Sequence, residues 1–256
     1  MHVDRALAKQ RAKQLVRRAI GEPYVGKRLK LRRLSRVLPG LDLHPAAILD
    51  AGTEDATFVY WLADLYPTAT VIAVDIDASA IAACRAAQPA AYAPRVHFEE
   101  ASFTSLEAES FDLITAFDVL EHIDDDHAAA ANLARALRSG GTLLVHVPRD
   151  RWTTWSGTVQ RVPDDEAWRI NAGHVRQGYS PESLRELLVS AGLHVEQTET
   201  WVGRWGVLAH AVYRRLERPV PLRLLSIPVT DVCARLDRRR PRPEGNTVFA
   251  CAVKRG

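Results

Sequence analysis

The 256-residue chain has few cysteines and no long apolar run. Its three cysteines, Cys84, Cys233 and Cys251, lie far apart, which argues against a metal knuckle and against a disulfide framework. Reduced thiols are typical of cytosolic proteins, so we expect a cytoplasmic location. The first residues carry charges every few positions rather than an apolar block, so we expect no secretory signal. No stretch approaches the ~18 apolar residues that a transmembrane helix requires.

Acidic residues are scarce at both ends of the chain. Residues 1–38 contain 12 Lys/Arg and 2 Asp/Glu, residues 201–256 contain 12 and 4, and residues 39–200 contain 10 and 25. Basic ends are compatible with a nucleic acid or a membrane surface as partner. They are equally typical of amphipathic helices that pair with an acidic body, which we favour. Tyr24 is the one aromatic residue in the first segment, so the sequence does not indicate a base-stacking platform there.

Short apolar segments alternate with helical patterns between residues 46 and 148. The apolar segments are 46–52, 69–77, 95–101, 111–117 and 139–148, and the helical patterns are 55–67, 78–88 and 118–138. Strands that are apolar on both sides indicate a parallel sheet covered by helices on both faces. Right-handed crossovers then give a doubly wound α/β fold, which binds its ligand at the carboxyl ends of the strands.

The flanking segments divide the chain further. Two basic helices are predicted at 3–20 and 26–38, and residues 149–179 form a long connection. A helix over 180–193 has Ser180 as its N-cap and Pro181 in its first turn, and strands follow at 194–201 and 246–254. We therefore expect N-terminal helices that cap the site in residues 1–40. The core comprises residues 41–200 and 245–256, with a basic aliphatic insertion or lid at 201–244.

Five segments in this order resemble class I S-adenosylmethionine-dependent methyltransferases. They are ILDAG (48–52), VIAVDID (71–77), SFDLITAFDVLEHIDD (110–125), LRSGGTLLVHVP (137–148) and GHVRQGYSPESLRELLVSAGL (173–193). The last segment is similar to bacterial members that modify small molecules, lipids or sugars. The resemblance implies a mostly parallel, seven-stranded Rossmann-like sheet with an antiparallel last strand, and S-adenosylmethionine as the cofactor.

The resemblance also assigns cofactor contacts. Asp75, at the end of the second strand, would accept hydrogen bonds from both ribose hydroxyls, and Ile76 would pack on the adenine. The structural alternative for Asp75 is a strand-end carboxylate bonded to backbone. The residues expected at the cofactor are Asp50, Ala51, Gly52, Glu54, Asp75, Ile76, Ser102, Phe103, Phe117 and Asp118.

The first turn departs from the family pattern. The family has Asp-x-Gly-x-Gly-x-Gly, whereas this chain has Glu54 and Ala56 at the second and third glycine positions. Glu54 and Asp55 would repel a dinucleotide pyrophosphate by ~1–4 kcal/mol per close pair, whereas the net positive S-adenosylmethionine is compatible with them. We therefore expect a working site with an altered loop. The alternative is a domain with a degenerate loop that no longer methylates.

The expected reaction is in-line displacement on the sulfonium methyl group by O, N or C of a small, apolar or ring-bearing molecule, and specialised metabolism is the expected setting. His174, Arg176 and Tyr179 are the candidate catalytic residues, and their alternative is a structural loop. His146 and Asp118 are further candidates for a base, although a histidine inside a buried strand is more typical of a core. The sequence spacing indicates no metal ligands. An RNA methyltransferase and surface contact of residues 203–240 with a membrane remain alternatives, and the oligomeric state stays open.

Overall fold

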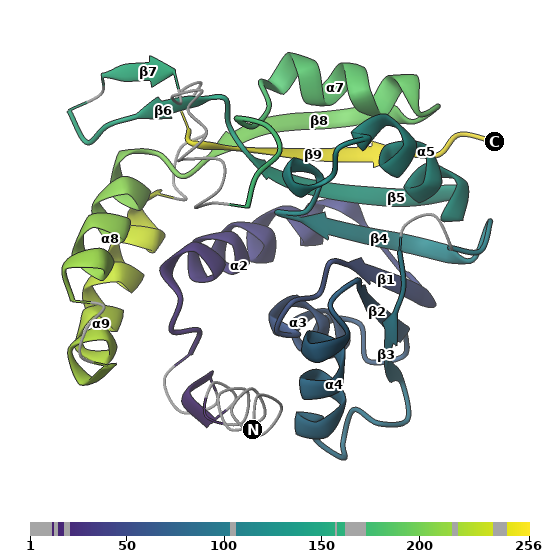
Figure 1. Cartoon of the computed structure of the whole chain (residues 1–256), viewed down its shortest axis with the longest axis horizontal. Helices are drawn as coiled ribbons and strands as arrows, with labels where there is room; N and C mark the ends of the chain where they lie inside the picture. The colour runs from purple at the N-terminus through teal and green to yellow at the C-terminus, as the bar shows by residue number, and fades with distance from the viewer. Residues whose placement is uncertain are drawn as a thin grey trace.

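The computed structural model describes residues 12, 15–17, 21–102, 106–156, 158–161, 173–216, 220–237 and 245–256, without the side chains of residues 220–223 (Figure 1). Phe103, Trp168 and most of the predicted helix at 3–20 lie outside these residues.

A seven-stranded sheet forms the centre of the molecule. Its strands are β1 (Ala47–Ala51), β2 (Thr70–Asp75), β3 (Val96–Glu100), β4 (Phe111–Phe117), β5 (Leu137–Pro148), β8 (His194–Trp201) and β9 (Thr247–Val253). The order is β3-β2-β1-β4-β5-β9-β8, and β9 runs antiparallel to both of its neighbours. The doubly wound Rossmann-like sheet with an antiparallel last strand is therefore confirmed.

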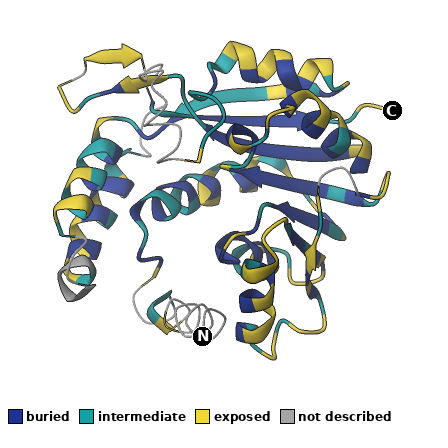
Figure 2. Ribbon diagram, viewed as in Figure 1, coloured by how far each residue is buried: buried dark blue, intermediate teal, exposed yellow. Residues whose placement is uncertain are grey.

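Helices cover both faces of this sheet. On one face, α2 (Val25–Val37), α3 (Thr57–Leu65) and α4 (Ala78–Ala87) share a hydrophobic core with the strands. On the other face, α5 (Asp126–Ala136) and α7 (Pro181–Ser190) form a second core. Figure 2 shows the central strands almost continuously buried between these layers. This two-sided burial explains why the strands read as apolar runs rather than as alternating patterns.

Helices α4 and α7 begin where the sequence places them, whereas the helix predicted over 118–138 begins only at Asp126, after the 3₁₀ turn at Leu120–His122. Ser180 accepts a hydrogen bond from the Ser183 backbone N–H at 3.0 Å, and Pro181 occupies the first turn of α7. Asp77 caps α4 in the same way, accepting from the Ser79 N–H at 2.8 Å. These caps satisfy backbone donors that have no partner within the helix.

The insertion and the long connection contain regular structure that the sequence did not reveal. Helices α8 (Arg204–Arg215) and α9 (Val220–Asp237) pack side by side and contact α2 (Figure 1). Strands β6 (Arg151–Thr153) and β7 (Val159–Arg161) pair in a separate two-stranded sheet. Two short 3₁₀ turns, η1 (Leu38–Leu41) and η3 (Leu120–His122), complete the described elements. Among the described helices, none is both long enough and apolar enough to cross a membrane.

Candidate cofactor site

The turn after β1 depends on Gly52. Its φ of +80° lies in the left-handed region, which glycine adopts without a steric penalty. A Cβ atom at this position would also overlap the Val119 side chain. The Gly52 and Thr53 backbone N–H groups donate to the Val74 carbonyl at 2.8 and 3.0 Å, which holds the turn against β2.

The two positions without glycine keep the glycine conformation. Glu54 has a φ of 49° and Ala56 a φ of 56°, so both residues are left-handed. This conformation costs a residue with a side chain roughly 1–2 kcal/mol. The backbone of the turn has thus kept three left-handed residues although only one of them is glycine.

The acidic side chains of the turn are directed to the N-terminal basic segment. The Glu54 carboxylate is 71% exposed and pairs with Lys27 Nζ at 2.8 Å. Asp55 pairs with Lys27 Nζ at 2.7 Å and with Arg17 at 3.0 Å. Burial acts to lower the pKa of Lys27, but the two carboxylates outweigh it and the pKa is raised. Lys27 therefore stays charged, and α2 is tied to the turn by ion pairs.

Asp75 ends β2 at the same edge of the sheet. Its carboxylate accepts the Glu54 N–H at 2.9 Å and the Asp77 N–H at 3.0 Å, so it fixes the turn after β1. A carboxylate has about four lone-pair positions, so these bonds leave acceptor capacity on both oxygens. Next to it, Ile76 is 77% exposed, which is unusual for an isoleucine beside a buried strand. Ser102 is exposed at the end of the neighbouring β3.

Asp50 lies buried in β1, directly before the turn. It accepts a hydrogen bond from Thr115 Oγ1 at 2.6 Å. Burial raises the pKa of Asp50 to about 6, although the Thr115 bond acts in the opposite direction. This carboxylate is therefore held in an environment that disfavours its charge.

The end of β4 carries a charged pair beneath α2. Asp118 is left-handed, with a φ of 54°, and its Oδ1 accepts from His146 Nδ1 at 2.7 Å. Its Oδ2 is ion-paired with Lys30 of α2. Burial acts to raise the pKa of Asp118, but Lys30 and His146 outweigh it and the pKa is lowered. Phe117, buried beside it, meets Phe58 edge to face with the ring centroids 4.9 Å apart.

His146 is a neutral imidazole, and one of its two ring nitrogens makes a hydrogen bond. Burial lowers its pKa, more strongly than Asp118 raises it. Because Nδ1 donates to Asp118, Nε2 carries the lone pair. Nε2 is buried and has no hydrogen-bond partner among the described residues. Its ring lies against Trp201, with the centroids 5.6 Å apart.

Two of the three predicted catalytic residues make structural bonds. Arg176 is ion-paired with Asp126 and donates to the Ile123 carbonyl. The Tyr179 hydroxyl donates to Asp126 Oδ2 at 2.7 Å, and the residue is 4% exposed. Burial raises the pKa of Tyr179, so the phenol stays protonated. Arg176 and Tyr179 are thus both engaged by partners within the chain. His174 lies beside His122 in an edge-to-face contact, with the ring centroids 4.8 Å apart.

Several contacts of the site join residues that are far apart in the sequence. Lys27 and Lys30 reach the turn and the β4 end only because α2 folds across them. Glu121, His122 and His174 each bring one possible metal-ligand atom within 4.8 Å of the others. Their positions in the sequence indicate no metal site because the segments meet only in the folded chain. The basic pattern of residues 26–38 was the one signal available for the lysines.

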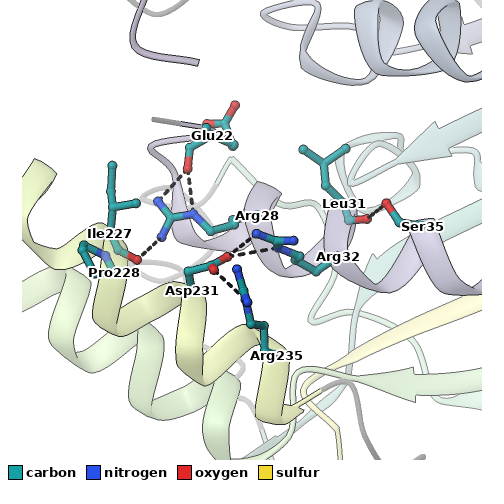
Figure 3. Close-up of a pocket in the computed structure, with 10 residues that line it drawn as sticks. Glu22, Arg28, Leu31, Arg32, Ser35, Ile227, Pro228, Asp231 and Arg235 are labelled. Atoms are coloured by element: carbon teal, nitrogen blue, oxygen red, sulfur yellow. Dashed lines mark hydrogen bonds and ion pairs between the residues drawn. The ribbon is translucent and has the colours of Figure 1, made fainter. Parts of the chain in front are cut away.

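A hollow of about 460 Å³ lies between α2 and α9 and contains none of the predicted cofactor residues. Its charged groups are largely paired with one another (Figure 3). Asp231 accepts from Arg32 at 2.7 Å and from Arg235 at 2.8 Å. The buried Arg28 donates to the backbone carbonyl groups of Glu22 and Ile227. The hollow therefore lies between two helices and is not part of the proposed site at the carboxyl edge of the sheet.

Comparison with known proteins agrees with this geometry. Residues 23–198 match the family described as "Methyltransferase domain". The chain belongs to this family. Its membership in the class I S-adenosylmethionine-dependent methyltransferases is thereby confirmed, and S-adenosylmethionine is the cofactor of that class.

Individual relatives are more distant. A Mycolicibacterium smegmatis protein named "Probable S-adenosylmethionine-dependent methyltransferase" is 31% identical over 153 residues, which cover 59% of this chain and 53% of that protein. The chain spans a quarter to about half of the length of the curated relatives it matches.

Two solved structures share the fold. The Haemonchus contortus phosphoethanolamine N-methyltransferase 2 in complex with S-adenosyl-L-methionine has a TM-score of 0.61 at 16% identity, over 95% of this chain and 60% of that one. The [4+2]-cyclase SpnF has a TM-score of 0.58 at 18% identity, over 88% and 81%. Because one of them is named as a cyclase, the shared fold alone does not decide the reaction.

Proposed function

We propose that the chain binds S-adenosylmethionine at the carboxyl edge of β1, β2 and β4 and transfers its methyl group to an O, N or C atom of a small molecule. The observation that carries this proposal is the preserved turn between Asp50 and Ala56. Glu54 and Ala56 hold the left-handed conformation of the missing glycines, and the Glu54 side chain is paired with Lys27 at the exposed surface. The turn therefore leaves its backbone, rather than a side chain, next to Asp75.

The neighbouring residues fit an adenosyl group. Asp75 has free acceptor capacity for a ribose diol, and the exposed Ile76 offers an apolar surface to the adenine. Lys27 and Lys30 bring positive charge for the carboxylate of the methionine part, and Asp118 brings negative charge for its ammonium group. Phe117 and Asp118 would border the methionine end, as expected.

When bound, S-adenosylmethionine supplies the activated methyl group, and the chain has to orient and deprotonate the acceptor. His146 is the base that the geometry supports best among the described residues. Asp118 fixes its Nδ1–H, so Nε2 is available to accept a proton, as in Asp–His pairs of other enzymes. We keep His174 as the second candidate, while Arg176 and Tyr179 hold the loop that carries it.

Calorimetric titration tests the cofactor part of the proposal. Wild-type protein should bind both S-adenosylmethionine and S-adenosylhomocysteine. Asp75→Asn should weaken binding by ~10-fold or more, because it loses two charge-assisted hydrogen bonds to the ribose. Asp42→Asn is the matched control, because the Asp42 side chain is 94% exposed and lies outside the site. Equal affinities for the two variants would contradict the role of Asp75.

A second candidate function is a domain that binds the cofactor without methylating. The two strained non-glycine residues of the turn favour it, because a degenerate loop would tolerate such substitutions. Incubation with methyl-labelled S-adenosylmethionine and a library of phenols, amines and hydroxy acids separates the two functions. Binding without transfer to any acceptor would favour the second candidate.

The acceptor is proposed to be small and apolar or ring-bearing. Trp155 and Trp205 meet edge to face at 5.5 Å, and Arg204 lies over both rings. Trp152 and Trp155 are about half exposed on the β6–β7 side. We propose that these elements, with α8 and α9, cover the acceptor. Alanine substitution of Trp152 and Trp155 should weaken acceptor binding and leave S-adenosylhomocysteine affinity unchanged.

Nucleic acid is not the proposed substrate, because the described basic side chains of α2 are engaged within the chain. Arg32 pairs with Asp231 and Arg33 with Glu199, besides the lysine pairs above. Contact of α9 with a membrane surface stays a prediction. It is supported by exposed Leu225, Val229 and Val232, and liposome sedimentation tests it. The cytoplasmic location likewise stays a prediction.

A further inference from the structure

Three possible metal ligands meet beside the end of β4. Glu121 and His122 belong to the 3₁₀ turn η3, and His174 belongs to the loop before α7. One ligand atom from each residue lies within 4.8 Å of the other two. Strand β4 ends at Phe117 and η3 begins at Leu120, so the group lies next to the β4 end.

The two segments are fastened to each other by hydrogen bonds. The Val175 N–H donates to the Glu121 carbonyl at 2.9 Å, and His122 Nδ1 lies 2.7 Å from the Gly173 carbonyl. Arg176 adds bonds from its guanidinium to the Ile123 and Asp124 carbonyls. The approach of His174 to η3 is therefore a built feature of the fold rather than a chance contact of surface side chains.

One hydrogen bond holds His122 in the tautomer that binds cations. A carbonyl can only accept, so His122 donates from Nδ1 and its Nε2 carries the lone pair. A backbone carbonyl on the other ring nitrogen is the usual arrangement around a metal-binding histidine.

The carboxylate of Glu121 gives a second, independent indication of a cation site. The residue is 1% exposed, and its Oε2 has no hydrogen-bond partner among the described residues. Buried carboxylates are normally paired or coordinate a metal, and a cation here would satisfy the unpaired oxygen.

We propose that Glu121, His122 and His174 bind a divalent transition-metal ion. Two imidazoles and one carboxylate suit zinc, iron, cobalt or manganese, whereas magnesium and calcium prefer oxygen ligands. Three protein ligands leave coordination positions open, as in catalytic rather than structural sites. If the proposed function holds, such an ion favours a methyl acceptor with a hydroxyl or carboxylate oxygen that can join the coordination shell.

Cobalt and zinc binding tests the site without any activity assay. Metal-free wild-type protein should bind one cobalt ion with visible d–d absorption bands, and zinc should displace it. Equilibrium dialysis should show that His174→Gln and Glu121→Gln each weaken zinc binding ~10-fold or more. His44→Gln is the matched control, because that side chain is 85% exposed and lies away from the group. The control should bind zinc as tightly as the wild type.

Absence of cobalt bands in folded wild-type protein would overturn the proposal. So would a His174→Gln protein that binds zinc as tightly as the wild type, or a His44→Gln protein that loses as much affinity as His174→Gln. A parallel titration with S-adenosylhomocysteine in metal-free buffer reports on folding and on the cofactor site. Cofactor binding without metal binding rejects the metal site alone, and metal binding without cofactor binding rejects only the proposed function.

Discussion

At the scale of single residues, Glu54 combines strain with an exposed ion pair. Its left-handed φ costs roughly 1–2 kcal/mol, whereas an exposed pair such as that with Lys27 contributes about 0–1 kcal/mol. We therefore expect Glu54→Gly to raise the free energy of unfolding by about 0.5–1 kcal/mol in urea denaturation. Glu54→Gln, which keeps the strain and loses the charge, should be slightly less stable than the wild type. A glycine variant less stable than the glutamine variant would contradict this account.

Asp50 predicts a pH dependence of stability. Its pKa is raised from 3.8 to about 6 in the folded protein, so the folded state binds more protons than the unfolded state between these values. The contribution of this group to stability is therefore full below pH 4 and falls as the pH rises to about 6. Asp50→Asn removes the ionisation and should be more stable than the wild type at pH 8. Urea denaturation at pH 4.5 and pH 8 should show this advantage shrinking at the lower pH.

The proposed role of His146 as the base is tested by measuring the effect of its replacement on kcat and on cofactor affinity separately. If its Nε2 accepts the acceptor proton, His146→Gln should lower kcat by ~10²-fold or more. The affinity for S-adenosylhomocysteine should change little, which also reports that the variant is folded. Glutamine can keep a hydrogen bond to Asp118, so a loss through the charge pair alone is limited. An unchanged kcat would transfer the role of the base to another residue, with His174 as the next candidate.

The sequence predicts some of these contacts and misses others. The contacts that it misses join residues far apart in the chain. Gly52, Asp75 and Asp118 lie at the carboxyl ends of β1, β2 and β4, so a parallel sheet brings them to one edge as the sequence predicts. Lys30 lies 88 residues from its partner Asp118, and no local pattern indicates that pairing. The left-handed Glu54 could be inferred only from the family pattern, because its residue type disfavours that conformation.

At the scale of elements, the buried Arg28 joins α2 to α9. Its guanidinium donates to the carbonyl groups of Glu22 and Ile227 (Figure 3). It also donates to Thr230, and the residue is 5% exposed. Arg28→Met leaves these acceptors buried without a donor, so the free energy of unfolding should fall by about 2–4 kcal/mol. Arg235→Met is the matched control in the same hollow.

The Arg235→Met control separates the effect of losing a buried guanidinium from the effect of losing a positive charge. The Arg235 side chain is 56% exposed and pairs only with Asp231 among the contacts described, so its loss should cost less than about 1 kcal/mol. Urea denaturation of both variants gives the comparison. Equal losses would mean that the α2–α9 contact does not depend on the buried guanidinium.

The elements differ in how well the sequence predicts them. The strands β1, β2, β4 and β5 are apolar runs between clear turns, so their bounds follow from the sequence within a few residues. The start of α5 at Asp126 does not follow, because the 3₁₀ turn η3 precedes it. The β6–β7 pair has strands of only three residues, which is too short for a periodic pattern. Helix α9 contains Pro228, a residue that normally ends a helix. In both cases tertiary contacts override the local signals.

At the scale of the whole molecule, the separation of charge along the chain has a structural purpose. The basic N-terminal helix lies over the acidic turns of the core, with Lys27 at the β1 turn and Lys30 at the β4 end. Within the described part of the chain, Lys27 and Lys30 thus use their charge to fasten α2 over the proposed cofactor site. The predicted pairing of the basic ends with the acidic body describes this arrangement better than an open binding surface does.

A crystal structure of the protein grown with S-adenosylhomocysteine would test the central claim most directly. We expect the adenosyl group to lie over Ile76 with both ribose hydroxyls on Asp75, and the Glu54 side chain to stay turned toward Lys27. A crevice filled by the side chain of Glu54 or Lys30, with no adenosyl density at millimolar ligand, would contradict the account.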